Sequence, residues 1–232
     1  MKLADKTAEI LRYLAPIYGN VETELDYGTP FQLLVATVLS AQCTDKRVNM
    51  VTPALFADYP DALTMAEATP EVLYEYIKSV SYPNAKAAHL AGLARMLRDD
   101  FGGEVPQTRE ELVRLPGVGR KTANVVQAVA FGKSALAVDT HVFRVAHRLG
   151  LVPQSATTPL KVEEALSKLI PAEDLGHSHF WLLLHGRYTC TALRPKCEKC
   201  GLAHLCKGPI RAKSGESTRK TSQRLASSRS KH

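Results

Sequence analysis

The sequence predicts an all-α protein with about ten short helices. Apolar residues recur at helical intervals of three and four, as in Leu90, Leu93, Ala94 and Leu97. Signals for helix starts are frequent, and no segment alternates apolar and polar residues as the strands of a hairpin would. At 232 residues the chain has room for one compact domain or two small ones.

The helix boundaries are expected at turn and capping residues. Residues 1–16 intersperse charged and apolar side chains, which is typical of an amphipathic helix. A long helix is expected to run to Phe101 and to end at the glycine pair 102–103. Helix starts are predicted from capping residues and from prolines at first helical positions, at Thr69-Pro70, Asn84, Thr108 with Glu111, and Thr158-Pro159.

The net charge of +7 lies in the C-terminal segment. Eight of the 30 basic residues and one of the 23 acidic residues fall in residues 207–232, so residues 1–206 carry 22 of each. The overall charge therefore says little about the partners of the folded part. Residues 211–232 are rich in Ser, Lys and Arg, which predicts a disordered tail that is either a solvated end or a phosphate-binding arm.

Neither a signal peptide nor a membrane span is expected. Charges interrupt the apolar residues of the N-terminal segment, whereas a signal peptide needs an unbroken apolar stretch. The most apolar segment, residues 31–41, is too short to cross a bilayer. We therefore expect a cytoplasmic, nucleoid-associated protein that makes no contact with a membrane.

Four of the five cysteines have the spacing C-x6-C-x2-C-x5-C: Cys190, Cys197, Cys200 and Cys206. Disulfides are not expected without an export signal, whereas four thiolates this close in sequence can surround one metal centre. Zinc sites usually pair their cysteines in two short knuckles, and here only the middle two form one. The spacing favours a [4Fe–4S] cluster over zinc, and four unrelated buried cysteines are the remaining alternative.

Basic residues surround these cysteines. Glu198 is the only acidic residue between Arg187 and Lys213. Cations on a loop held rigid by a cluster would suit contact with DNA phosphates, which makes Lys196 and Lys199 candidate DNA-binding residues. The alternative is that they offset the negative charge of the thiolate cluster, and both can hold.

A glycine turn lies between two helical patterns at about residues 108–131. Within its residues Pro116, Gly117, Val118 and Gly119, the proline and the two glycines enforce a tight turn, and the second helix is expected to begin beside Gly119. Free backbone amides at that helix start, with the positive end of the helix dipole, form a pocket for an anion such as a DNA phosphate. The commoner alternative is a plain connector between two helices.

Lys121 and Asp139 are the candidate reactive pair. An ammonium at a helix N-terminus faces an unfavourable dipole, so the position is expected to favour the neutral amine, which can form a Schiff base with a carbonyl carbon. Taken singly, a lysine such as Lys121 is more often an ordinary surface cation, and Asp139 is expected to be a helix cap and not a catalytic carboxylate.

These motifs together resemble the endonuclease III family, the bifunctional DNA glycosylases of the helix-hairpin-helix superfamily. LPGVGRKTANVV, AVDTHVFRV, LSAQCTD, HGRYTC and the four-cysteine spacing occur in the family's order and span about residues 25–210. The resemblance implies two α-helical lobes with the active-site cleft between them. One lobe is a six-helix barrel with the helix-hairpin-helix, over residues 25–133, and the other is a cluster domain over residues 134–210 joined by the N-terminal helix, residues 1–24.

The resemblance also implies the chemistry. Lys121 matches the lysine that attacks C1′ of a damaged nucleotide, and Asp139 matches the carboxylate that assists. Gln42 matches the residue that fills the space left by the extruded nucleotide. The implied activity is removal of oxidised pyrimidines such as thymine glycol from double-stranded DNA, with cleavage 3′ to the abasic site, by a monomer. The implied roles of the remaining residues are phosphate binding by the hairpin, with Arg120 at its end, and ligation of a [4Fe–4S] cluster by the four cysteines.

The sequence departs from the family in one loop. Residues 80–86 align with a loop that reads glycine, hydrophobic, tyrosine in the family and that wedges the opposite strand, but here Ser81 replaces the glycine and Tyr82-Pro83 follow. Tyr82 is the candidate wedge. The alternative functions are a monofunctional glycosylase, a non-catalytic DNA-binding module and an electron-carrying iron–sulfur protein. Lys121 argues against the first, and its occurrence together with Asp139 argues against the second. The single cluster and the DNA-binding hairpin argue against the third.

Overall fold

The computed structural model describes residues 1–19 and 23–208, which form helices and loops without a strand. The predicted tail, residues 211–232, lies outside the described residues. Eleven α-helices and two short 3-10 helices follow one another along the described chain: α1 (Leu3–Tyr18), α2 (Pro30–Ser40), α3 (Asp45–Asp58), α4 (Ala62–Ala66), α5 (Pro70–Ile77), α6 (Pro83–Phe101), α7 (Arg109–Leu112), α8 (Arg120–Phe131), α9 (Thr140–Leu149), α10 (Pro159–Leu169), α11 (Ala172–Tyr188), η1 (Cys197–Lys199) and η2 (Ala203–Leu205).

Three predicted threonine caps are confirmed. The side chains of Thr69, Thr108 and Thr158 each accept a hydrogen bond from the backbone N–H three residues later, at 3.5, 3.2 and 3.3 Å. Proline is the first helical residue after two of them. These helices start where the sequence predicts because a cap is a local interaction that needs no distant partner.

The predicted start of α6 at Asn84 is wrong. The N-cap residue is Tyr82, in the left-handed region at φ 56° and ψ 50°, and Pro83 is the first helical residue. Proline has a fixed φ and no N–H, so it suits this first position and moves the start ahead of Asn84. The C-terminal end of α6 lies at Phe101, as predicted. Gly102 adopts φ 62°, and the N–H of Gly103 donates to the carbonyl of Leu97 at 2.8 Å.

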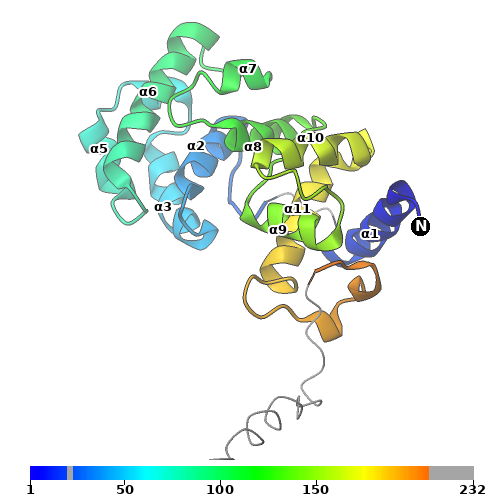
Figure 1. The fold of residues 1–232 in the computed structure, drawn as a ribbon. Helices are drawn as coiled ribbons and strands as arrows, with labels where there is room; N and C mark the ends of the chain where they lie inside the picture. The colour runs from blue at the N-terminus through cyan, green and yellow to red at the C-terminus, as the bar shows by residue number, and fades with distance from the viewer. Residues whose placement is uncertain (20–22, 209–232) are drawn as a thin grey trace, which may run out of the picture.

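Two separate apolar cores divide the helices into two lobes (Figure 1). The first core runs from Leu25 to Val126 and joins α2–α8. The second core takes Ile10, Leu11 and Leu14 from α1 and combines them with α9, α10 and α11 and with the cysteine segment. Each fully buried leucine contributes about 1.5–3 kcal/mol relative to an exposed one. The exact domain limits given above remain a prediction.

The N-terminal helix lies against the last helix and the cysteine segment. The indole Nε1–H of Trp181 in α11 donates to the carbonyl of Gly19 at 2.8 Å. The hydroxyl of Tyr13 in α1 accepts from the backbone N–H of Gly201 at 3.1 Å, and Glu9 lies 2.8 Å from His204. Figure 1 shows α1 beside the cysteine segment, although more than 170 residues separate them. These contacts join the two ends of the folded chain in one lobe.

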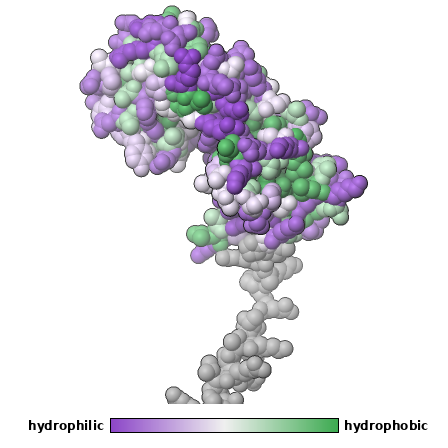
Figure 2. Space-filling view, turned by 45° about the horizontal axis from the view of Figure 1, so that its top comes forward, coloured by the Kyte–Doolittle hydropathy of each residue, from purple (hydrophilic) through white to green (hydrophobic). Residues whose placement is uncertain are grey.

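Two rounded bodies and a narrower junction form the surface in Figure 2, and hydrophilic residues cover much of the body that Figure 1 shows as α3–α7. In the described part of the chain, no helix combines the length and the apolar composition that crossing a membrane requires.

Candidate active site and metal centre

A cavity of about 750 Å³ lies between the two lobes. Residues from both lobes line it: Ser40, Gln42, Cys43 and Asp45 from the end of α2 and the start of α3, Lys121 and Val125 from α8, Asp139 and His141 at the start of α9, and His179 and Arg187 from α11. The structure thus brings three predicted site residues, Lys121, Asp139 and Gln42, to the wall of one cavity. It has the size of an ordinary small-molecule site.

Asp139 is the N-cap of α9. Its Oδ1 accepts from the backbone N–H of His141 at 2.9 Å and of Val142 at 2.8 Å, and its Oδ2 lies 2.9 Å from Nδ1 of His141. Burial by itself would raise the pKa of Asp139, but the hydrogen bonds from Val142 and His141 lower it below its ordinary value. The carboxylate is therefore held ionised and fixed in direction on the cavity wall.

Lys121 is the second residue of α8, directly after the glycine turn. Its side chain lines the cavity, and its positive charge lowers the pKa of His179 across that cavity. The charge of Asp139 acts on the same histidine in the opposite direction. Lys121 and Asp139 therefore both lie close enough to the buried imidazole of His179 to affect its pKa. The cavity wall thus carries an amine and an ionised carboxylate.

His179 is a site residue that the sequence reasoning missed. It lies on α11, is buried, and its Nδ1 is 2.7 Å from the carbonyl oxygen of Ala137. Burial, above all, lowers the pKa of His179 to about 4, so the ring is neutral near pH 7 and donates its Nδ1 proton to that carbonyl. This bond fixes the segment that leads into Asp139. No local signal marks His179, because its partner lies 42 residues earlier in the chain.

The glycine turn is a tight loop between α7 and α8. Gly117 adopts φ 79°, and a Cβ there would lie 3.0 Å from the Cβ of His89, so only glycine fits without strain. Gly119 is the N-cap of α8 and offers no side chain to the first turn. The first backbone N–H groups of α8 thus have no side-chain cap, which is the arrangement that binds an anion.

The guanidinium of Arg120 is directed away from this turn. Its Nε and Nη2 each lie 2.8 Å from a carboxylate oxygen of Glu163 on α10. Arg109 adds a longer contact with the same carboxylate at 3.6 Å. The contribution of Arg120 to an anion pocket is therefore its backbone N–H, while its side chain joins the hairpin to the second lobe.

Gln42 and Tyr82 share an uncommon backbone conformation. They are the two non-glycine residues with positive φ among the described residues, at 55° and 56°. This conformation costs a residue with a Cβ about 1 kcal/mol or more, and such residues concentrate at functional sites. Gln42 lines the cavity, whereas Tyr82 lies outside its lining and has 65% of its surface exposed.

Glu24, Asp45 and Arg187 form a charge network on the cavity wall. Arg187 on α11 forms ion pairs with Glu24 and with Asp45 at the start of α3, the latter at 3.3 Å. Tyr188 donates its hydroxyl proton to Glu24 at 2.8 Å. No local signal in HGRYTC predicts these contacts of Arg187 and Tyr188, because their partners lie more than 140 residues earlier in the chain. They connect the two lobes at the edge of the cavity and give it polar groups able to hydrogen-bond a ligand.

The four cysteines line a separate small cavity in the second lobe, with Leu149 and His185. Two sulfurs accept hydrogen bonds: Arg148 Nη1 donates to Cys190 Sγ at 3.4 Å, and the N–H of Gly208 donates to Cys206 Sγ at 3.3 Å. His185 Nε2 lies 3.7 Å from Cys200 Sγ. Such donors stabilise metal-bound thiolates.

Among residues 1–19 and 23–208, no three Cys, His, Asp or Glu side chains are close enough to hold a single metal ion. Four cysteine sulfurs that share one small cavity are the donor set that an iron–sulfur cluster requires. Cys190, Cys197, Cys200 and Cys206 are thus the side chains that would hold a [4Fe–4S] cluster. When bound, the cluster crosslinks the segment that follows α11.

Lys196 and Lys199 are exposed beside the cysteines. Neither lines the cavity that holds Lys121 and Asp139. The structure thus leaves these two lysines on a surface of the second lobe, where a phosphate backbone could reach them.

Comparison with known families agrees with this geometry. A family model described as the HhH-GPD superfamily base excision DNA repair protein matches residues 35–172. A second, described as the iron-sulfur binding domain of endonuclease III, matches residues 190–206, the segment that holds the four cysteines.

Relatives match over nearly the whole chain. Endonuclease III of Synechocystis sp. (strain ATCC 27184 / PCC 6803 / Kazusa) is 50% identical over 209 residues, covering 88% of this chain and 94% of the relative. Endonuclease III of Escherichia coli (strain K12) is 44% identical over 201 residues, covering 87% and 94%.

Solved structures show the same fold. A trapped endonuclease III–DNA covalent intermediate, the estranged-adenine complex, matches with a TM-score of 0.83 at 44% identity, covering 89% of this chain and 97% of that one. A thermostable thymine-DNA glycosylase matches with a TM-score of 0.79 at 26% identity, covering 88% and 96%. The chain belongs to the endonuclease III family of the HhH-GPD superfamily and is a base excision repair enzyme of the DNA glycosylase class.

Proposed function

We propose that the protein is a bifunctional enzyme that removes oxidised pyrimidines from double-stranded DNA and then cuts the strand at the resulting abasic site. The observation that carries this proposal is the shared cavity of Lys121 and Asp139. An amine beside an ionised, firmly held carboxylate can act as a nucleophile with an electrostatic partner. A monofunctional glycosylase has no need of the amine, and a binding module has no need of either group.

The chemistry proceeds in two stages. Once its ammonium has given up a proton, the amine of Lys121 attacks C1′, the bond from C1′ to the base breaks, and the base leaves with the electron pair and takes up a proton. The carboxylate of Asp139 stabilises the positive charge that develops on the sugar. The ring then opens to an imine, a proton leaves C2′, and the 3′ phosphate departs by β-elimination. The related trapped covalent intermediate of endonuclease III with DNA supports a covalent step at this site.

The DNA contacts follow from the same arrangement. The hairpin amides from Pro116 to Arg120 bind a phosphate near the reacting nucleotide. Gln42, on the cavity wall, fills the space that the extruded nucleotide leaves, and the exposed Tyr82 wedges the opposite strand. Lys196 and Lys199 contact the backbone farther along the duplex. Solved complexes of endonuclease III with DNA support binding in this manner.

The proposed substrates are thymine glycol and related oxidised pyrimidines, together with preformed abasic sites. The family resemblance supports this choice, and the polar groups of Arg187 and Asp45 in the cavity suit a base that has lost aromaticity and gained hydroxyl groups. One active cavity within one chain suits a monomer, and a chromosomal substrate suits a nucleoid-associated location.

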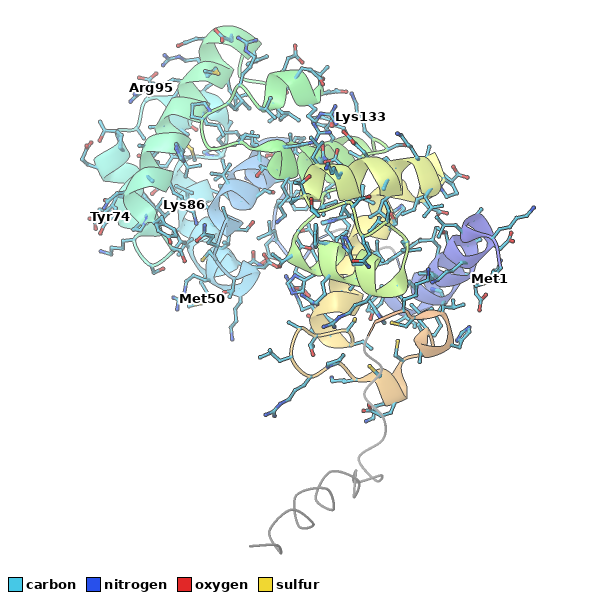
Figure 3. All side chains as sticks on the ribbon, in the orientation of Figure 1. Met1, Met50, Tyr74, Lys86, Arg95 and Lys133 are labelled. Carbon is cyan, nitrogen blue, oxygen red and sulfur yellow. The ribbon has the colours of Figure 1, made fainter. Side chains whose placement is uncertain are left out.

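Borohydride trapping on a thymine-glycol duplex tests the proposal. The wild type is expected to form a covalent adduct with the duplex, and Lys121→Ala is expected to form none. Lys133→Ala is the matched control, because Lys133 follows the other end of α8, donates to the carbonyl of Gln107 at 3.1 Å and does not line the cavity (Figure 3). Base removal by the wild type without an adduct would show a monofunctional glycosylase, and binding without base removal would show a non-catalytic module.

A further inference from the structure

Lys86 is a buried lysine that connects the two loops proposed above to enter DNA. Only 5% of its surface is exposed, and its Nζ donates to the carbonyl oxygens of Leu39 and Ala41, both at 2.7 Å. These two carbonyls lie at the C-terminal end of α2, where a cation is favoured by the helix dipole and by unpaired acceptors. Ala41 directly precedes Gln42, so the ammonium holds the peptide that leads into it.

The backbone of Lys86 acts on the other loop. Its N–H donates to the carbonyl of Tyr82 at 3.1 Å, which is the first hydrogen bond of α6. Gln42 and Tyr82 are the two non-glycine residues of the described chain in the left-handed region. A conformation of this kind persists only where surrounding contacts impose it. Lys86 supplies such a contact on each side, through its side chain to Ala41 and through its backbone to Tyr82.

We propose that Lys86 is a positioning residue that fixes the Gln42 and Tyr82 loops relative to each other, so that gap filling and strand wedging occur together when a nucleotide is extruded. This inference rests on the proposed function, because it assigns DNA contacts to Gln42 and Tyr82. The ammonium touches neither the cavity lining near Lys121 nor the reacting atoms, and it acts only through the loops.

Burying the ammonium of Lys86 costs hydration free energy, and apolar packing would not require a charge at this position. Burial lowers the pKa of Lys86 below its ordinary value, with the nearby Cys43 acting in the opposite direction. An apolar side chain of the same length would avoid the loss of hydration but would leave the two carbonyls without a donor. The ammonium thus has a specific effect: it holds the C-terminal end of α2 through these two carbonyls.

The same helix provides a matched control. Arg95 of α6 donates through Nε to the carbonyl of Ala66 at 3.4 Å and through Nη2 to the carbonyl of Ala68 at 3.2 Å. It therefore binds the end of α4 as Lys86 binds the end of α2, but at a place without a proposed DNA contact. Figure 3 shows the two cations on separate parts of α6. Lys86→Met and Arg95→Met each remove two hydrogen bonds from a side chain to backbone carbonyls at a helix end. Only Lys86→Met affects the proposed DNA loops.

The experiment compares two duplexes under single-turnover conditions, one with thymine glycol and one with a preformed abasic site at the same position. Lys86→Met is expected to lower the rate of base removal about tenfold and the rate of cleavage at the abasic site less than about threefold, because an abasic nucleotide is unpaired and easier to extrude. Arg95→Met is expected to leave the ratio of the two rates at the wild-type value. Lys86→Arg, which keeps the donors, is expected to recover part of the lost rate.

A 2-aminopurine placed opposite the lesion gives a second readout, because its fluorescence rises when the lesion is extruded and the stack opens. The rise is expected to be smaller with Lys86→Met than with Arg95→Met. The inference would be overturned if Lys86→Met kept the wild-type ratio of the two rates. It would also be overturned if Lys86→Met and Arg95→Met lowered the rate of base removal equally. If Lys86→Met does not fold, Lys86→Gln and Lys86→Arg are compared in the same way. Failure of the wild type to form an adduct would overturn the proposed function instead, and the fluorescence would still test Lys86.

Discussion

Arg120 and Glu163 form a two-bonded ion pair between the lobes, with Nε and Nη2 of the arginine each 2.8 Å from a carboxylate oxygen. The arginine follows the glycine turn on α8 and the glutamate lies on α10, 43 residues later. Glu163 is buried, while the arginine side chain is 43% exposed. The pair therefore fixes the hairpin to the second lobe and so sets the orientation of the helix that carries Lys121.

Glu163→Gln is expected to lower the free energy of unfolding by about 1–2 kcal/mol, because one charge-assisted hydrogen bond to Arg120 is lost. The loss is limited because the guanidinium of Arg120 is partly exposed and its charge is screened by solvent. Denaturant unfolding measures this change. Glu110→Gln is the matched control, since Glu110 contacts Arg109 at 3.5 Å with a 76% exposed side chain, and its effect is expected to stay within about 0.5 kcal/mol. Equal effects of the two substitutions would contradict a structural role for the Arg120 pair.

The two roles of Asp139 can be separated by substitution. Asparagine caps a helix about as well as aspartate, so Asp139→Asn is expected to change the free energy of unfolding by less than about 0.5 kcal/mol. Because the carboxylate charge is lost, the single-turnover rate of base removal is expected to fall about a hundredfold or more. Asp139→Ala removes the cap as well and is expected to cost about 1 kcal/mol. A fully active Asp139→Asn would show that the carboxylate is only a cap.

The stability of the protein is expected to fall in mild acid because of His179. Its pKa in the folded chain is about 4, below the ordinary 6.5, so between these values the unfolded chain takes up a proton that the folded chain does not. The contribution of the neutral ring is thus complete above pH 6.5 and decreases as the pH falls towards 4, by up to about 1.4 kcal/mol per pH unit.

The comparison with His179→Asn isolates this effect, since the asparagine amide can donate to the carbonyl of Ala137 but does not titrate. Between pH 7 and pH 5 the wild type is expected to lose about 1–2 kcal/mol more than the variant in denaturant unfolding. Parallel stability curves for the two proteins would show that the ring protonates freely in the folded state.

The cluster ligands are expected to differ sharply from the fifth cysteine. Cys200→Ser removes one thiolate, so the purified protein is expected to lose its brown colour and to unfold at lower temperature, because the crosslink of the cysteine segment is lost. Cys43→Ser is the control and is expected to stay brown, since Cys43 lies against the first core and not beside the other cysteines. Visible absorbance and iron analysis measure both, and a colourless wild type that contains zinc would refute the cluster.

The left-handed backbone conformation of Tyr82 is expected to lower the stability of the protein, while its side chain serves as the proposed wedge. Glycine adopts φ 56° without strain, so Tyr82→Gly is expected to raise the free energy of unfolding by about 0.5 kcal/mol. The same change removes the proposed wedge, and we expect the rate of base removal from duplex DNA to fall about tenfold. A variant with lower stability would show that the Tyr82 side chain makes contacts that outweigh the strain.

Much of the fold and the site could be predicted from sequence because the relevant interactions are local. Thr108 caps its helix through a residue three positions away, and Asp139 does the same at α9. Cys197 and Cys200 form a knuckle within four residues. Where a second local preference competed, the prediction was wrong: Pro83 fixed the start of α6 and displaced the expected cap at Asn84.

The remaining relationships were decided by tertiary structure. By itself the sequence determined the helices, the cysteine spacing and the presence of a lysine after a glycine turn, since each depends on neighbours along the chain. Packing of the two lobes decided that Lys121 and Asp139 line one cavity, that His179 bonds to Ala137, and that Lys86 reaches Ala41, 45 residues earlier. A bond of this kind depends on which helix faces meet, and helical periodicity specifies that a face is apolar without specifying its partner.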